Sequence, residues 1–119
     1  MTHIKVDIQL PLRFNPDEVE KVGKEIPDEL FFQTYEELLD LFGGISTSNV
    51  PIAGSWIHPT MKKRYDDDTR IFTVVVDSED RKTISKVPKI TNLILYKNKL
   101  KERFKQEEIF MIATRCTVL

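Results

Sequence analysis

The residues best suited to chemistry lie in one stretch near the middle of the chain. Its aromatic, imidazole, carboxylate and guanidinium side chains are Trp56, His58, Tyr65, Asp66, Asp67, Asp68 and Arg70. Carboxylates together with an imidazole can bind Mn²⁺ or Zn²⁺, and an arginine can hold an anion. A pocket built here would have Trp56 as its wall, His58 as an acid, base or ligand, and Arg70 as the anion-binding group. We expect such a pocket where this loop meets Tyr35 and the turn at Gly43-Gly44.

The spacing of these residues, however, matches no known metal-binding loop. Successive side chains on an extended strand point to opposite faces, so the three aspartates cannot all converge on one ion. The same argument separates Ser55 from His58, which a nucleophile–base pair would need to bring together. The stretch is therefore more typical of a solvated hairpin loop. No catalytic residue, metal or cofactor is predicted from it.

Two groups of cations are candidates for phosphate binding. Lys62, Lys63 and Arg64 share the same loop, and Lys97, Lys101 and Lys105 recur every fourth residue. Phosphate binding needs several cations on one surface, which both groups could provide. Sheets that bind RNA also present aromatic residues on their open face, whereas the first strand presents polar ones: Lys5, Asp7, Gln9 and Arg13. We therefore interpret the lysines as a rim that covers apolar surface, and nucleic-acid binding is the alternative.

The elements that must position these residues follow from hydrophobic periodicity. Residues 4–14 alternate between apolar and polar side chains without a miss, which predicts a strand with one buried face. Asn15-Pro16-Asp17-Glu18 is typical of a helix start and predicts a short helix. A second helix is predicted over 28–42, because its apolar stripe is followed by the Gly43-Gly44 stop. That stripe consists of Phe31, Tyr35, Leu38 and Phe42.

The second half of the chain predicts two further strands, a helix and a last strand. Residues 50–57 predict an irregular edge strand, because Pro51 and Gly54 interrupt it. Residues 58–69 predict a hairpin loop whose arms can be partly paired, and 70–77 predict an interior strand that is apolar on both faces. Residues 78–90 show no period. A helix capped by Thr91 then presents the stripe Leu93, Tyr96, Leu100 and Phe104, and a strand starts near Ile109.

The order strand, helix, strand, strand, helix, strand predicts an α+β fold. Two crossovers separated by a hairpin give the ferredoxin-like, split βαβ arrangement, with a four-stranded antiparallel sheet and two helices on one face. The length of 119 residues fits a single domain over 1–119.

Three short motifs also resemble a known group of proteins. These are Phe42-Gly43-Gly44, the pair Gly54 and Trp56, and the run from Leu100 to Ile109, LKERFKQEEI. They resemble small prokaryotic proteins of unknown function that are thought to be ferredoxin-like. The resemblance spans residues 31–112. It implies the same fold and no particular activity.

Composition narrows the classes of function. The net charge of −1 argues against a protein that is basic overall. One cysteine, Cys116, excludes an intrachain disulfide and fits a reducing cytoplasm. No apolar run approaches the roughly 18 residues of a membrane span, and the N-terminus lacks the apolar core of a signal peptide. We expect a non-enzymatic cytoplasmic protein that acts by association, as a homodimer. The alternatives are a nucleic-acid-binding or nuclease-like protein and a small-molecule or metal-dependent enzyme using residues 56–70.

Overall fold

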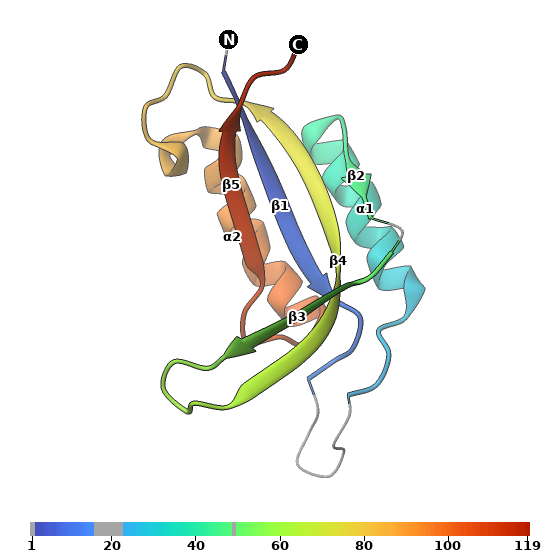
Figure 1. Cartoon of the computed structure of the whole chain (residues 1–119). Helices are drawn as coiled ribbons and strands as arrows, with labels where there is room; N and C mark the ends of the chain where they lie inside the picture. Colours follow the sequence, from blue (N-terminus) through green and yellow to red (C-terminus); the bar gives the residue numbers. More distant parts are fainter. Residues whose placement is uncertain (1, 16–22, 49) are drawn as a thin grey trace.

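The computed structural model describes residues 2–15, 23–48 and 50–119. These residues form an α+β fold in which two helices lie behind an antiparallel five-stranded sheet (Figure 1). In chain order the elements are β1 (His3–Pro11), α1 (Asp28–Phe42), β2 (Ser46–Thr47), β3 (Ile52–Ile57), β4 (Arg64–Asp77), the 3₁₀ turn η1 (Ile84–Lys86), α2 (Pro88–Arg103) and β5 (Phe110–Cys116).

The central strands run in the order β2-β4-β1-β5, and β3 pairs with the first half of β4. β1 has a neighbour on each side, and its apolar residues are buried under the helices: Ile4, Val6, Ile8 and Leu10. This confirms the alternation predicted for the first strand from Ile4 to Leu10, whereas the strand ends at Pro11 and not at Phe14. Its pairing with β5 ends at Gln9, two residues before Pro11, which has no N–H for a ladder bond. The face opposite the helices is open to solvent.

The sheet has five strands where four were predicted. The predicted strand over 50–57 begins only at Ile52, and a separate two-residue strand, β2, precedes it. Pro51 lies between the two and cannot donate a ladder hydrogen bond, so the edge is broken there. The loop predicted over 58–69 is also shorter, because β4 already begins at Arg64 and pairs with β3.

α1 spans the predicted residues. Gly43 follows it in the left-handed conformation, with φ of 76°, and its N–H donates to the Leu39 carbonyl. Phe31 and Leu38 are buried against the sheet, as the stripe predicted. The short helix predicted after Asn15 lies outside the described residues.

α2 begins at Pro88, three residues before the predicted cap. Pro88 occupies the first turn, where a missing N–H costs no helical hydrogen bond. Thr91 therefore lies inside the helix, and its hydroxyl donates to the Ser85 carbonyl at 3.0 Å. η1 fills part of the stretch that showed no period.

Aromatic rings join the two helices to the sheet. Phe104, just after α2, is fully buried, and its ring lies 5.3 Å from that of Phe31. Phe31 in turn lies 6.4 Å from Phe72 on β4. The Phe104 ring therefore lies at the beginning of α1. Phe31 is its ring partner because α1 and α2 run in opposite directions, which brings the end of α2 to the beginning of α1 (Figure 1).

An ion pair also links the helices. The Arg103 guanidinium donates from both terminal nitrogens to Glu37, with N–O distances of 2.6 and 3.0 Å. The Tyr96 hydroxyl and the Lys99 ammonium donate to the same carboxylate at 2.7 and 3.0 Å. The hydrogen bond from Arg103 is the main cause that lowers the Glu37 pKa to about 2. We call these four residues the Glu37 clasp.

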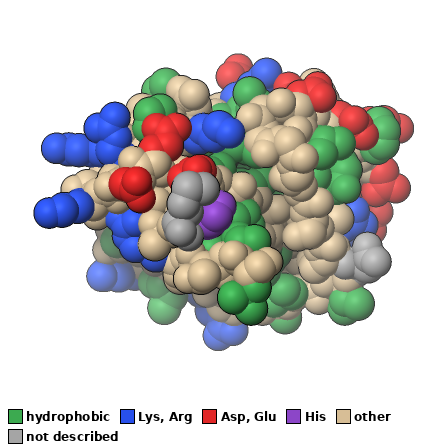
Figure 2. All heavy atoms as spheres, turned by 90° about the horizontal axis from the view of Figure 1, so that it is seen from above, with side chains coloured by type: hydrophobic (Ala, Val, Ile, Leu, Met, Phe, Trp, Pro, Cys, Tyr) green, Lys and Arg blue, Asp and Glu red, His purple; other side chains and the backbone are tan. Residues whose placement is uncertain are grey.

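Charge is divided between the two helices. α1 carries five acids and no Lys or Arg, whereas residues 81–103 hold eight Lys or Arg and one acid, Glu102. Seen from above, Lys and Arg side chains gather on the side of η1 and α2, and Asp and Glu side chains line the side of α1 (Figure 2). Within the described residues, no helix is long and apolar enough to cross a membrane.

Candidate functional site

The hairpin of β3 and β4 gathers the predicted aromatic residues into one cluster. Trp56 and Tyr65 are directly opposite each other in the ladder, and their rings stack at 4.9 Å. The Trp56 ring also lies 5.9 Å from His58 and 6.0 Å, edge to face, from Phe110 at the start of β5. The bent hairpin thus reaches across the end of the sheet to β5 (Figure 1).

His58 is held by the hairpin turn. Its Nδ1 accepts hydrogen bonds from the backbone N–H groups of Thr60 and Met61, at 3.2 and 3.1 Å. Its Nε2 lies 3.7 Å from a carboxylate oxygen of Glu107. Ser55 turns away and donates to Asp66 at 2.6 Å. The structure therefore does not bring Ser55 and His58 together as a nucleophile and a base, and His58 orders the turn.

Most of the candidate phosphate-binding cations already have partners. Arg64 pairs with Asp66 at 2.7 Å, and Lys97 pairs with Glu108 at 2.5 Å. Lys63 lies over the Tyr65 ring and Lys105 over the Phe14 ring, each 5.1 Å from the ring centre.

Lys62 and Lys101 complete the set. Lys62 sits in the turn with a positive φ of 56°, and Lys101 is partly buried on α2. The His58–Glu107 contact places the turn beside the segment that follows α2. The two predicted groups of cations therefore occupy the same end of the molecule.

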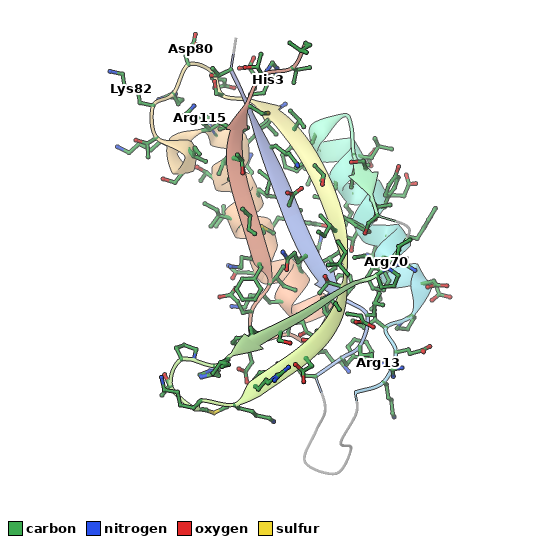
Figure 3. All side chains as sticks on the ribbon, in the orientation of Figure 1. His3, Arg13, Arg70, Asp80, Lys82 and Arg115 are labelled. Atoms are coloured by element: carbon green, nitrogen blue, oxygen red, sulfur yellow. The ribbon has the colours of Figure 1, made fainter. Side chains whose placement is uncertain are left out.

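A cavity of about 840 Å³ opens on the other side of the hairpin. It lies between β3, the first half of β4 and the beginning of α1, where Asp28 and Phe31 line it. Arg70 lies beside the N-terminal end of α1, and Arg13 lies below it on the segment that leaves β1 (Figure 3). The volume falls within the range of about 300–1,000 Å³ that small-molecule sites occupy.

This position corrects the predicted pocket. Arg70 lines the cavity as expected, but the described lining does not include Trp56 or His58. The expected neighbour Tyr35 instead packs its ring edge on Phe72, at 6.2 Å. The base of the hairpin lies beside the beginning of α1, whereas the Gly43-Gly44 turn follows the other end of that helix.

The walls of the cavity carry both signs of charge. Asp66, Asp67 and Asp68 line one side. Burial, and then the charges of Asp66 and Asp68, raise the pKa of Asp67. Among the described residues, no group of three or more His, Cys, Asp or Glu side chains is arranged to hold a metal ion.

Arg70 contributes a guanidinium to the lining of the cavity. Its guanidinium carbon lies 5.0 Å from the centre of the Phe31 ring. Its Nε is buried and has no hydrogen-bond partner among the described residues. Sequence reasoning found Arg70 but missed Arg13, Asp28 and Phe31, because no local pattern joins them to it.

The comparisons with known proteins support the fold alone. No family model matches the chain, and no curated protein matches it. Among solved structures, the chain is similar to one described as a phage SAM lyase in its apo state. The TM-score is 0.54 with 12% sequence identity, over 96% of this chain and 79% of that one. At this identity the likeness concerns the arrangement of helices and strands.

Proposed function

We propose that this chain acts by association, as a cytoplasmic homodimer formed through the open face of its sheet. The observation that carries the proposal is a set of exposed apolar side chains on that face. Val75, Phe110 and Ile112 are 41%, 44% and 52% exposed, and Trp56 contacts Phe110 at its edge. We call these four residues the apolar strip. Exposed apolar surface of this kind marks interaction sites.

The partner is a second copy because the open face can complement itself. Its central polar residues are already paired: Lys5 lies 3.6 Å from Asp7, and Thr73 donates to Asp7 at 2.6 Å. The face therefore carries little unpaired charge that would oppose a copy of itself. In a twofold dimer the same patch packs against itself.

Charge also favours the face over the edge of β5. Pairing two β5 edges would bring together two basic flanks that carry Lys82, Lys89 and Arg115, and like charges repel. Stacking two open faces instead leaves both helical layers on the outside, separated by two sheets.

The size of the face requires the hairpin to take part. Three strands of seven residues span a patch of about 23 by 14 Å. That is less than the roughly 800 Å² that each partner of a stable complex buries. The Trp56–Tyr65 stack extends the apolar surface beyond the strands, so it should lie within the interface.

Sedimentation or light scattering at protein concentrations of roughly 1 to 100 micromolar should show a dimer. This range covers dissociation constants typical of weak dimers. Ile112→Lys should give a monomer, because it places a charge among the exposed apolar side chains of the face. Leu95→Lys, on the exposed side of α2, is the matched control and should leave the dimer intact. A wild-type monomer throughout this range would reject the proposal. Dissociation by Leu95→Lys alone would assign the interface to the helices.

Nucleic-acid binding is the second candidate. The observation that favours it is the shared location of the Lys62-Lys63-Arg64 turn, Lys101 in the last turn of α2 and Lys105 just after that helix. Several cations on one surface can follow a phosphate backbone. Arg64 and Lys97 already pair with carboxylates, which weakens the case for nucleic-acid binding.

Lys62→Glu/Lys63→Glu separates this candidate from the first. Both residues are exposed in the turn, so the fold should remain. If the protein binds nucleic acid, the double variant should lose retention of single- or double-stranded oligonucleotides at low salt. Binding by the wild type should also weaken steeply as salt rises. Failure of the wild type to bind either oligonucleotide at low salt would eliminate this candidate.

We further propose that the fold is the ferredoxin-like one. In its favour, the order β2-β4-β1-β5 places the second, third, first and last strands side by side, if β2 and β3 are counted as one interrupted strand. The helices that connect them lie on one face.

A further inference from the structure

We propose that the cavity beside Arg70 binds a small zwitterionic molecule, one that carries a carboxylate and a cationic group as amino acids do. Arg70 would take the carboxylate, and Asp68, two residues before it on the same face of β4, would take the cation. This site faces the helix layer, so it is separate from the open face through which we propose dimerisation.

The argument for the carboxylate starts from the contacts of Arg70. The guanidinium packs over Phe31 at 5.0 Å, which leaves the nitrogens around its edge as donors. Its Nε is buried without a partner, although a buried donor without a hydrogen bond costs about 1–3 kcal/mol. No carboxylate among the described residues lies within ion-pair distance of Arg70. A planar oxyanion is the group that matches a guanidinium edge through two parallel hydrogen bonds.

The argument for the cation starts from the aspartates on the hairpin. Only Asp66 has strong local partners, the Ser55 hydroxyl at 2.6 Å and the Arg64 Nε at 2.7 Å. Asp68 lies on the same face of β4 as Arg70 and lines the cavity, and its carboxylate has no hydrogen-bond or ion-pair partner among the described residues. A cation placed here would pair with the Asp68 carboxylate in the same cavity as Arg70. The cavity therefore offers one place for each charge of a zwitterion.

The probe is L-lysine, and its decarboxylated form, cadaverine, is the matched ligand control. We expect L-lysine to shift the Arg70 Nε–H resonance in ¹H–¹⁵N spectra and to bind measurably by calorimetry. Loss of a hydrogen-bonded charge contact is worth about 10- to 100-fold in affinity, so cadaverine should bind at least tenfold more weakly. If L-lysine gives no saturable shift at millimolar concentration, or cadaverine binds equally well, the proposal is wrong.

Variants test each end of the ligand. Arg70→Lys keeps the charge but removes the planar pair of donors, and Asp68→Asn removes one acid at constant size. Each should weaken L-lysine binding about tenfold or more, with a cooperative melting transition retained. Arg81→Lys, an exposed change at the opposite end of the sheet, should bind like the wild type. Ile112→Lys should also bind like the wild type, so the site can be tested whether or not the protein dimerises. Unchanged binding by both Arg70→Lys and Asp68→Asn would place the ligand elsewhere.

Discussion

Replacing Phe104 with alanine should lower the free energy of unfolding by about 3–5 kcal/mol, the usual cost of truncating a fully buried Phe. The side chain has no exposed surface, and its ring contacts Phe31 at 5.3 Å where α2 meets α1. The cavity left behind would remove packing contacts between the two helices and the sheet. Since small domains have a total stability of about 5–15 kcal/mol, the variant should melt at a much lower temperature or fail to fold. Urea denaturation followed by circular dichroism measures the change.

Two controls make this result specific. Phe32→Ala removes the same type of side chain from α1, at the position after Phe31. There the side chain is 67% exposed. Lys101→Ala removes a cation from the rim of α2, three residues before Phe104. Both should change stability by no more than about 0.5 kcal/mol. If Phe104→Ala melts like either control, Phe104 does not fill the core.

The second large effect is expected from Arg103→Ala, which breaks the Glu37 clasp. Removing one partner of a buried ion pair costs about 3–5 kcal/mol, because the other charge is left uncompensated. The Arg103 side chain is only 8% exposed, but that of Glu37 is 27% exposed and keeps Lys99 and Tyr96 as partners. We therefore expect a loss of about 2–3 kcal/mol at pH 7.

The pH dependence identifies the cause of that loss. The Glu37 pKa is about 2 in the folded protein, below its ordinary value of 4.5. The ion pair therefore contributes its full stability above about pH 4.5, and this contribution is lost as pH falls towards 2. The difference in unfolding free energy between wild type and Arg103→Ala should shrink over the same range. A difference that stays constant down to pH 2 would mean that Arg103 acts through packing alone.

Lys99→Ala is the matched comparison for Arg103→Ala. Lys99 donates to the same carboxylate at 3.0 Å, but its side chain is 58% exposed. Exposed ion pairs contribute about 0–1 kcal/mol, so this variant should lie close to the wild type. Equal losses from the two variants would show that burial does not set the strength of the clasp.

Local periodicity was sufficient to predict the principal elements. The alternation from Ile4 to Leu10 determined the buried face of β1, because successive side chains on a strand point to opposite sides. The stripe from Phe31 to Phe42 and the glycine after it determined both ends of α1. Each of these signals lies within one element, so it can be read without knowing what the element packs against.

The candidate sites depended on contacts that no local pattern contains. Trp56 meets Tyr65 because the turn of residues 58–63 sets the register of β3 against β4. Arg70 reaches Phe31 because the base of the hairpin lies beside the beginning of α1. A shift of one residue in this register would move every side chain of one strand to the opposite face, although the composition of the loop would be the same.

The sequence by itself determined the α+β class, the two helices and the buried face of the first strand. It also marked Trp56, Tyr65 and Arg70 as residues to examine. Only the tertiary structure decided that Trp56 and Tyr65 stack by β5 while Arg70 lines a cavity on the other side of the hairpin. Only the tertiary structure joined Arg103 to Glu37, 66 residues away in the chain. The physical reason is that hydrophobic burial repeats with the period of each element, whereas charge pairing depends on strand register and on how the helices lie over the sheet.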